Sequence, residues 1–443
     1  MTKYFGTDGI RGVYGSPHMN DSFARSVGLA IGKFLSQKSC PSPCVVIGRD
    51  TRPSGASLQQ SISEGVQASG GKIINAGTLP TPALAYAVLL HRADFGVMIT
   101  ASHNPHTDNG IKCFSSQGTK LRPDEEQTLE SLIDPKHVSA AKFDTCEPQS
   151  LIDDYTSLVS NFFLKLNLTG MRICLDLANG ATGDTTPRVL EDLGATVITS
   201  YRRAGLINEG CGSENLGSLQ LLVQNEQADL GIAHDGDGDR VRFVDSLGRI
   251  VHGDQILGLL ALQTQQDGNL KSSKFVTTIY SNSGLLSSLN KRGISTLTSD
   301  VGDRNVYLKM VEEGCNWGGE SSGHIICTDY LPTGDGLFAA LSVLSAMRSQ
   351  SRLLEDLAKQ IDLWPSMSGA FMVNQKKPIK ELPELFDTIQ KEETVLKDQG
   401  RILLRYSGTE PKIRLLVEGT SEALIETSFQ NLRLSIQKSL SSS

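Results

Sequence analysis

The chain has few aromatic residues, few closely spaced cysteines and no excess of positive charge. Aromatics make up 6% of its 443 residues while glycine accounts for 43, a balance that favours many tight turns over a large aromatic core. Among the eight cysteines only Cys40 and Cys44 lie close together, so no second pair completes a zinc pattern. We therefore expect free thiols and a cytoplasmic protein.

The charge balance and hydropathy also bear on partners. A formal net charge of −7 argues against bulk binding to nucleic acid, although local clusters still allow an anionic small molecule. No apolar run reaches the length of a membrane span, and no charged-then-apolar signal stands at the N-terminus. We therefore expect no nucleic-acid partner and no membrane association.

Strand and helix signals alternate through most of the chain. Strands are predicted at 45–47, 72–76, 95–100, 172–176, 196–199, 228–233, 275–280, 294–298 and near Trp317, and helices at 56–68, 82–91, 186–193 and 216–227. Such alternation predicts parallel sheets covered by helices, here in three successive α/β units.

The last part of the chain has a different pattern. Strands at 369–374, 401–405 and 413–418, with helices at 382–396 and 422–440, predict an α+β module with antiparallel potential. Linkers are expected near 148–154, His252 and 364–368. The fold class is therefore α/β, and the predicted domains are 1–153, 154–252, 253–366 and 367–443.

The most distinctive segment is Asp235-Gly236-Asp237-Gly238-Asp239-Arg240, which follows the apolar run 228–233. Glycine lets the backbone turn tightly enough for three carboxylates to face one point, and an all-oxygen site suits Mg²⁺ before Zn²⁺. A solvated acidic turn is the plain alternative. A calcium loop of the EF-hand type is excluded, because Arg240 and Ser246 occupy the positions that require Gly and Glu.

A second segment, Thr100-Ala101-Ser102-His103-Asn104-Pro105, directly follows an apolar strand. Ligands of open α/β sheets bind at the carboxyl ends of strands, so Ser102 stands where chemistry usually occurs. A turn closed by proline is the alternative, because adjacent Ser and His are weak support for a triad. In the loop 108–112, Lys112 could act as a general acid or base if cationic surroundings depress its pKa.

Two short segments near the N-terminus present arginines. Residues 6–12 place Arg11 between glycines, and Gly48-Arg49-Asp50-Thr51-Arg52 follows a strand. Arginine forks match phosphate oxygens in pairs. A salt bridge to a neighbouring acid, such as Asp50, is the alternative for each.

Two further polar loops complete the pattern. The segment 317–324 carries an acceptor, hydroxyls and an imidazole, which suit sugar hydroxyls but also occur in ordinary irregular loops. The segment 405–414 combines glycine, hydroxyls and arginines, which favours an anion nest over a plain hairpin turn. A metal loop, a serine, a sugar-like loop and a phosphate nest in four segments predict four domains that converge on one cleft.

On these motifs the chain resembles the α-D-phosphohexomutases over essentially its full length. The matching segments are 6–12, 100–105, 235–240, 319–324 and 405–411. It is most similar to the branch that acts on glucosamine phosphates, on the basis of Ala101 and the N-terminal motif, although Ser321 departs from the Gln common there. The resemblance implies three similar α/β domains with mixed sheets plus a C-terminal α+β domain around a central cleft.

The resemblance also implies roles for individual residues. Ser102 is expected as a phosphoserine, and one Mg²⁺ per subunit is expected on Ser102, Asp235, Asp237 and Asp239. Acid or base roles fall to Lys112, His103 and His324, and charge neutralisation to Arg11 and Arg240. The expected substrate-binding residues are Glu320, Ser322, Arg405, Ser407, Gly408, Thr409 and Arg414.

The implied activity is the interconversion of glucosamine 6-phosphate and glucosamine 1-phosphate. It would run through a 1,6-bisphosphate, with hexosamine 1,6-bisphosphate as activator, on the pathway to UDP-N-acetylglucosamine and cell-wall precursors. A homodimer stays open. The alternatives are a phosphomannomutase or phosphoglucomutase of the same superfamily, a phosphatase using the same serine, and a non-catalytic sugar-phosphate sensor.

Overall fold

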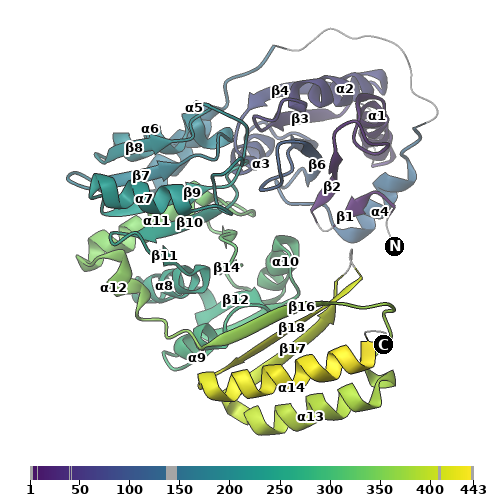
Figure 1. Cartoon of the computed structure of the whole chain (residues 1–443). Helices are drawn as coiled ribbons and strands as arrows, with labels where there is room; N and C mark the ends of the chain where they lie inside the picture. Colours follow the sequence, from purple (N-terminus) through teal and green to yellow (C-terminus); the bar gives the residue numbers. More distant parts are fainter. Residues whose placement is uncertain are drawn as a thin grey trace. The chain divides into compact units, whose positions relative to one another are not determined.

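The computed structural model describes residues 3–6, 8–38, 40, 42–135, 147–407 and 411–440. The chain divides into two compact units, residues 1–280 with 294–360 and residues 281–293 with 361–443 (Figure 1). The first unit holds three α/β sheets, and the second holds an antiparallel sheet of three strands.

The first sheet of the first unit has six strands in the order β1-β2-β6-β5-β3-β4. Their bounds are β1 Phe5–Gly6, β2 Gly9–Val13, β3 Cys44–Arg49, β4 Lys72–Thr78, β5 Phe95–Ile99 and β6 Asp108–Ser115. The accompanying helices are α1 Asp21–Gln37, α2 Gly55–Ala68, α3 Thr81–Leu90 and α4 Pro123–Ser131. Strands β3, β4 and β5 are parallel, whereas β6 and β2 are antiparallel.

Helices α1 and α2 pack closely because glycines line their contact. A Cβ at Gly28 would lie 2.2 Å from the carbonyl oxygen of Ile62, and one at Gly65 would lie 2.2 Å from that of Arg25. Side chains there would force the helices apart. The N-terminus of α1 is fixed by Asn20, whose side chain accepts a hydrogen bond from the Phe23 amide at 2.9 Å.

The second and third sheets repeat this layered arrangement. The second has the order β11-β10-β9-β7-β8, and the third β13-β12-β14-β15. The strands are β7 Arg172–Asp176, β8 Thr196–Ser200, β9 Leu230–His234, β10 Val241–Asp245, β11 Ile250–Val251, β12 Lys274–Thr278, β13 Ser295–Ser299, β14 Trp317–Gly319 and β15 Ile325–Cys327. The helices of these segments in the first unit are α5 Ile152–Phe162, α6 Thr186–Asp192, α7 Gly217–Glu226, α8 Gly253–Gln266, α10 Asp303–Glu313, α11 Gly336–Gln350 and α12 Leu354–Ala358, with 3-10 turns η1 Ala181–Asp184 and η2 Lys271–Ser273.

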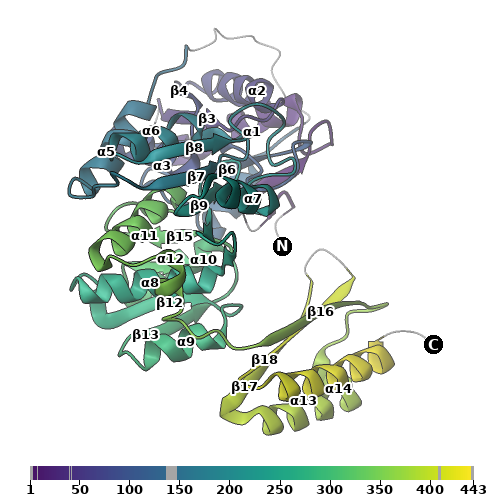
Figure 2. The ribbon, with the colours of Figure 1, turned by 60° about the vertical axis from the view of Figure 1, so that its left-hand side comes forward.

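The second unit is a sheet covered on one face by two helices (Figure 2). Its strands β16 Ser366–Met372, β17 Gly400–Tyr406 and β18 Lys412–Gly419 pair antiparallel in the order β16-β18-β17. Helices α13 Pro383–Leu396 and α14 Glu422–Leu440 bury apolar residues such as Leu385 and Leu432 against it. The unit also contains α9 Ser283–Asn290 and the turns η3 Ile379–Glu381 and η4 Lys397–Gln399.

The predicted architecture of three α/β segments and a C-terminal antiparallel module is confirmed. Residues 108–112, expected as a loop, instead begin strand β6, because they pair with both β5 and β2. The predicted linker at 148–154 is shorter, since α5 already begins at Ile152. Likewise, β16 begins at Ser366 within the predicted linker 364–368.

Two further observations concern the part of the chain that the structure describes. The seven cysteines within it are free thiols. No helix there is both long enough and apolar enough to cross a bilayer.

Candidate active site

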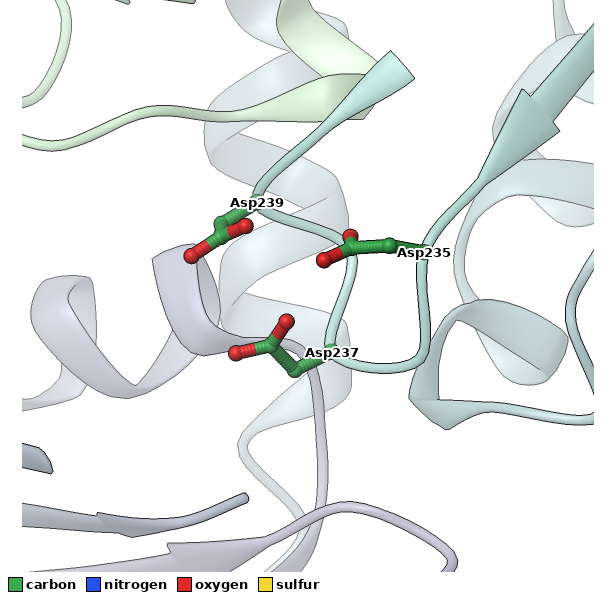
Figure 3. A group of neighbouring side chains, drawn as sticks. All are labelled: Asp235, Asp237 and Asp239. Atoms are coloured by element: carbon green, nitrogen blue, oxygen red, sulfur yellow. The ribbon is translucent and has the colours of Figure 1, made fainter. Parts of the chain in front are cut away.

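Three carboxylates converge at the end of strand β9. The strand is fully buried and delivers the loop 235–240, in which Gly238 adopts a φ of +72°. Ligand oxygens of Asp235, Asp237 and Asp239 all lie within 4.8 Å of one another, and the carboxylates point toward a common centre (Figure 3). The structure therefore has the cluster of three carboxylates that the sequence predicts.

The residues of this cluster fit a metal ion. Burial and the neighbouring Asp239 and Asp237 carboxylates raise the pKa of Asp235 well above its usual value. Oδ1 of Asp237 and Oδ1 of Asp239 are buried and accept no hydrogen bond from the described residues. Repelling, partly unsatisfied carboxylates are stabilised by a hard divalent cation, because it takes oxygen ligands and neutralises their charge.

Ser102 lies directly against this cluster. Its hydroxyl donates a hydrogen bond to Oδ2 of Asp235 at 2.6 Å, and its Oγ lies 3.2 Å from Nδ1 of His103. The residue is 1% exposed and adopts a left-handed φ of +54°, which is unusual for a side chain with a Cβ. The backbone amide of Ser102 in turn donates to Oγ1 of Thr100 at 2.8 Å.

Lys112 lies inside the acidic cluster. Its Nζ is 2.8 Å from Oδ2 of Asp237, 2.9 Å from Oδ2 of Asp239 and 3.4 Å from Oδ2 of Asp8. Burial lowers the pKa of the ammonium, but these carboxylates outweigh it and raise that pKa well above its ordinary value. The condition for a depressed pKa at Lys112, cationic surroundings, is therefore not met, because the side chains that surround its ammonium are carboxylates.

Arg11 contacts the serine loop from strand β2. Its Nη1 lies 3.3 Å from both the Ala101 carbonyl oxygen and Oδ1 of Asn104, and its Nη2 pairs with Asp8. Asp8 also pairs with Lys120. The arginine thus lies against the loop that carries Ser102, held by one acidic neighbour.

Arg240 and His324 meet where the second and third sheets adjoin. Their backbones form an isolated β-bridge, and the Arg240 amide donates to Oδ1 of Asp235 at 3.1 Å. Nε2 of His324 lies 3.3 Å from Oδ2 of Asp303, and its Nδ1 lies 3.7 Å from Oδ1 of Asp239. Burial lowers the pKa of His324, but these two carboxylates raise it overall.

The opposite shift occurs at His103. Burial and the nearby guanidinium of Arg240 lower the pKa of His103 to about 4. The ring beside Ser102 is therefore neutral at pH 7. The surroundings thus shift the pKa values of the two histidines of the site in opposite directions.

The predicted sugar-binding residues lie in the turn between β14 and β15. Oε1 of Glu320 accepts a hydrogen bond from the Gly302 amide at 2.9 Å. Oγ of Ser322 is buried and has no hydrogen-bond partner among the described residues. A buried hydroxyl in that state is available to a ligand.

The predicted phosphate-binding residues lie in the second unit. Arg405 of β17 and Arg414 of β18 stand directly opposite each other. Guanidinium groups on neighbouring strands suit the oxygens of a phosphate group, which they can bind through paired hydrogen bonds. Ser407 is buried, and its carbonyl oxygen accepts from Nζ of Lys376 at 2.5 Å. Gly408 and Thr409 lie outside the described residues, as does Thr7 of the first motif.

Arg52 does not present its guanidinium to a ligand, and the alternative reading, a salt bridge to Asp50, is what the structure has. Its Nε donates to Oδ2 of Asp50 at 3.0 Å. Nη1 donates to the carbonyl oxygens of Pro105 and Asp108, and Nη2 donates to those of Ser102 and Asn104. All five N–H donors of the guanidinium are therefore used within the protein. Arg52 shapes the serine loop instead of holding phosphate.

Sequence reasoning missed a second group of charged residues around the site. Lys120, in the segment between β6 and α4, pairs with both Asp8 and Asp303. Asp303 begins helix α10 and faces His324. Neither residue belongs to a distinctive motif, so their pairing is visible only in three dimensions. The one available signal was Asp8 itself, which stands within the glycine-flanked N-terminal segment.

Comparison with known proteins places the whole chain in one family. It matches the phosphoglucomutase/phosphomannomutase α/β/α domain I over residues 2–138, domain II over 153–248, domain III over 252–364 and the C-terminal domain over 370–434. The phosphoglucosamine mutase of Erwinia tasmaniensis is 42% identical over 432 residues, covering 96% of each chain. That of Lawsonia intracellularis is 41% identical and covers 99% of each.

Solved structures share the fold at lower identity. A phosphoglucomutase/phosphomannomutase family protein from Burkholderia thailandensis has a TM-score of 0.82 at 23% identity, covering 99% of this chain and 98% of its own. An N-acetylphosphoglucosamine mutase from Aspergillus fumigatus, solved with GlcNAc-6P and magnesium, has a TM-score of 0.67 at 16% identity, covering 100% and 96%.

The serine, the acidic loop and the four matched domains agree with the similarity of the full-length relatives. The chain therefore belongs to the phosphoglucosamine mutases of the phosphoglucomutase/phosphomannomutase family.

Proposed function

We propose that this protein interconverts glucosamine 6-phosphate and glucosamine 1-phosphate through a phosphorylated Ser102. The observation that carries the proposal is the 2.6 Å contact between Oγ of Ser102 and Oδ2 of Asp235, at the edge of the carboxylate cluster. A phosphoryl group on this oxygen would lie beside a metal site and beside Arg11 and Arg240. Phosphoryl transfer needs this kind of positioning and charge neutralisation.

Each half-reaction moves one phosphoryl group. The bond between phosphorus and Oγ of Ser102 breaks while phosphorus bonds to the 1-OH or 6-OH oxygen of the sugar. The hydroxyl gives its proton to a base, and Oγ of Ser102 takes a proton from an acid. The product is a 1,6-bisphosphate, which turns over in the site and returns its other phosphoryl group to Ser102. Hexosamine 1,6-bisphosphate added from outside would therefore activate dephosphorylated enzyme.

We assign the metal site to Mg²⁺, one per subunit. Asp235, Asp237 and Asp239 would hold it together with a phosphoryl oxygen on Ser102, because an all-oxygen donor set suits this ion. When bound, it supplies positive charge that neutralises the transferring phosphoryl group. The role of the protein is to keep three carboxylates together in a buried loop.

We assign proton transfer to Lys112, with His103 and His324 as further candidates. Lys112 is hydrogen-bonded to Asp237 and Asp239, and His103 lies beside Oγ of Ser102. Arg11 and Arg240 would stabilise charge on the phosphoryl oxygens. Arg11 is already oriented there through its contacts with the Ala101 carbonyl and the Asn104 side chain.

We assign substrate recognition to two groups of residues. Glu320 and Ser322 would bind sugar hydroxyls, a role supported by the hydroxyl of Ser322, for which the described part of the chain offers no hydrogen-bond partner. The non-reacting phosphate would bind Arg405, Ser407, Gly408, Thr409 and Arg414. The facing pair of Arg405 and Arg414 supports this, because two guanidinium groups on neighbouring strands can bind one phosphate group through charge-assisted hydrogen bonds.

We further propose the domain division 1–153, 154–252, 253–366 and 367–443, a cytoplasmic location and a role in supplying UDP-N-acetylglucosamine for cell-wall precursors. A homodimer is a prediction for light scattering on the purified protein. These proposals follow from family membership and from the segmentation into three α/β sheets and one antiparallel sheet.

The Ser102→Ala variant tests the proposed chemistry. Turnover of glucosamine 6-phosphate should fall by about 10³-fold or more, because the phosphoryl carrier is lost. Circular dichroism and the melting temperature should stay close to those of the unchanged protein. A variant that keeps more than a few per cent of the activity would contradict the phosphoserine route. Net release of inorganic phosphate would instead identify a phosphatase.

A further inference from the structure

Two side chains from distant segments hold the same two carbonyl oxygens of the serine loop. Nη2 of Arg52 donates to the carbonyl oxygens of Ser102 and Asn104, both at 2.9 Å. Nδ2 of Asn208 donates to the same two oxygens, at 2.7 and 2.9 Å. Each NH₂ group has two hydrogens and each carbonyl oxygen has two lone pairs, so the four bonds satisfy all of them.

This arrangement bears on the backbone of Ser102. The residue is held at a φ of +54°, a left-handed conformation that is unfavourable for a residue with a Cβ. Such a backbone persists only when its surroundings fix it. The donors of Arg52 and Asn208 hold the Ser102 backbone from two different segments of the chain. Arg52 lies after β3, and Asn208 lies after β8.

Asn208 also connects the serine loop with the acidic loop. Its neighbour Ile207 packs so closely on Gly236 that a Cβ there would lie 2.6 Å from Cδ1 of Ile207 and 2.8 Å from the Ser102 carbonyl oxygen. The Asn208 amide donates to the Ala178 carbonyl at 2.9 Å, which ties this segment to the end of β7. The segment that carries Ile207 and Asn208, the serine loop and the acidic loop therefore pack together.

From these contacts we propose that Asn208 is a positioning residue for Ser102. Its hydrogen bonds go neither to the Ser102 hydroxyl nor to the three carboxylates, but they set the serine backbone relative to the loop that carries Asp235. Loss of its two hydrogen bonds leaves each carbonyl with the Arg52 donor, so the fold should survive while the position of Oγ becomes less defined. This inference rests on the proposed role of Ser102.

The Asn208→Asp variant tests the proposal. It keeps the shape of the side chain and tolerates the φ of +59° at this position, but it replaces the donor with an acceptor facing two carbonyl oxygens. The matched control is Asn179→Asp. Asn179 also has a left-handed φ, of +52°, and its Nδ2 donates at 3.2 Å to Leu206 of the same loop, not to the serine segment.

Two measurements are made on both variants of the full chain. Steady-state kinetics with glucosamine 6-phosphate should give a kcat about 10- to 100-fold lower for Asn208→Asp, with KM changed less than about threefold, because misplacement of a reacting atom lowers the rate of transfer. Hydrogen exchange should become faster in peptides covering 100–110. Asn179→Asp should show clearly smaller effects in both measurements.

A kcat within twofold of the unchanged protein, or equal losses in both variants, would overturn the proposal. If Asn208→Asp does not fold, Asn208→Gly replaces it, since glycine keeps the backbone conformation and removes the side chain. The exchange measurement is made without substrate or metal, so it tests the contact even if Ser102 never carries phosphate. Absence of phosphate would count against the proposed function alone.

Discussion

Oγ of Ser102 lies 2.6 Å from Oδ2 of Asp235, although 133 residues separate them in the chain. The two residues lie in the loops that follow strands of different sheets, Ser102 after β5 and Asp235 after β9. A second contact joins the same two α/β segments. The amide of Thr81 donates to the Asp237 carbonyl oxygen at 2.8 Å, and its hydroxyl donates to Oδ2 of Asp237 at 2.6 Å. The nucleophile and the carboxylate cluster therefore come together only when the first two α/β segments pack against each other.

The carboxylate cluster should lower the stability of the metal-free protein and provide the ligands for the metal ion. Asp235→Asn removes one of three buried, mutually repelling carboxylates, so the melting temperature in EDTA should equal or exceed that of the unchanged protein. The rise in melting temperature on addition of MgCl₂ should shrink strongly, because the variant has lost a ligand. Thermal unfolding with and without the ion measures both effects.

Asp245→Asn is a suitable control for that experiment. Asp245 is a buried carboxylate on the neighbouring strand β10, but it accepts hydrogen bonds from the Leu247 and Arg249 amides and lies outside the cluster. Its loss should lower the melting temperature and leave the response to MgCl₂ intact. The reverse pattern in the two variants would refute a metal site at Asp235.

The facing arginines of the second unit should act on substrate affinity. Arg414→Gln should raise KM for glucosamine 6-phosphate about 10-fold or more, since a charge-assisted contact to phosphate contributes about 1.5–3 kcal/mol. Stability should change little, because Arg414 is exposed. Lys391→Gln on helix α13 removes the same charge from the helical side of the unit and should leave KM unchanged. An equal KM in Arg414→Gln and the unchanged protein would remove this residue from the phosphate site.

The buried Asp335 should make stability depend on pH. Its carboxylate caps α11 and accepts hydrogen bonds from the Phe338 amide and from the hydroxyls of Tyr155 and Tyr330, yet burial raises its pKa to about 6 from an ordinary 3.8. Between these values the folded protein holds a proton that the unfolded chain has released. The associated stabilisation, about 3 kcal/mol, is complete below pH 3.8 and is lost as the pH rises through 6.

Urea unfolding of the unchanged protein and of Asp335→Asn between pH 4 and 7 measures this effect. As the pH rises, the unchanged protein should lose up to about 3 kcal/mol of unfolding free energy relative to the variant. Asp356→Asn is the control, because the Lys359 side chain lowers the pKa of this exposed carboxyl, so its difference should stay flat above pH 4. A flat difference for Asp335→Asn would show that its carboxyl is not protonated in the folded state.

The sequence located most elements because their apolar runs are bounded by turn residues. Strand β7 and helix α14 begin and end where the pattern predicted. The beginning of strand β6 was not predicted, because Asp108-Asn109-Gly110 has the composition of a turn. It becomes a strand only through pairing with strands on both sides. Local composition cannot report such tertiary pairing.

The candidate site was predictable where its residues are adjacent in the sequence, as in the 235–240 loop. The surroundings of Lys112 were not, because the carboxylates that face it lie 125 and 127 residues away. The role of Arg52 was hidden for the same reason. Its neighbour Asp50 suggested a simple ion pair, whereas most of its donors bind carbonyl oxygens of the serine loop.

The most direct test of the account is the phosphorylation state of Ser102. The purified protein is incubated with a hexosamine 1,6-bisphosphate, and its intact mass and the peptides covering 92–112 are measured by mass spectrometry. The account predicts one added phosphate, located on Ser102 and absent from Ser102→Ala. An enzyme that turns over glucosamine 6-phosphate while Ser102 never acquires phosphate would contradict it.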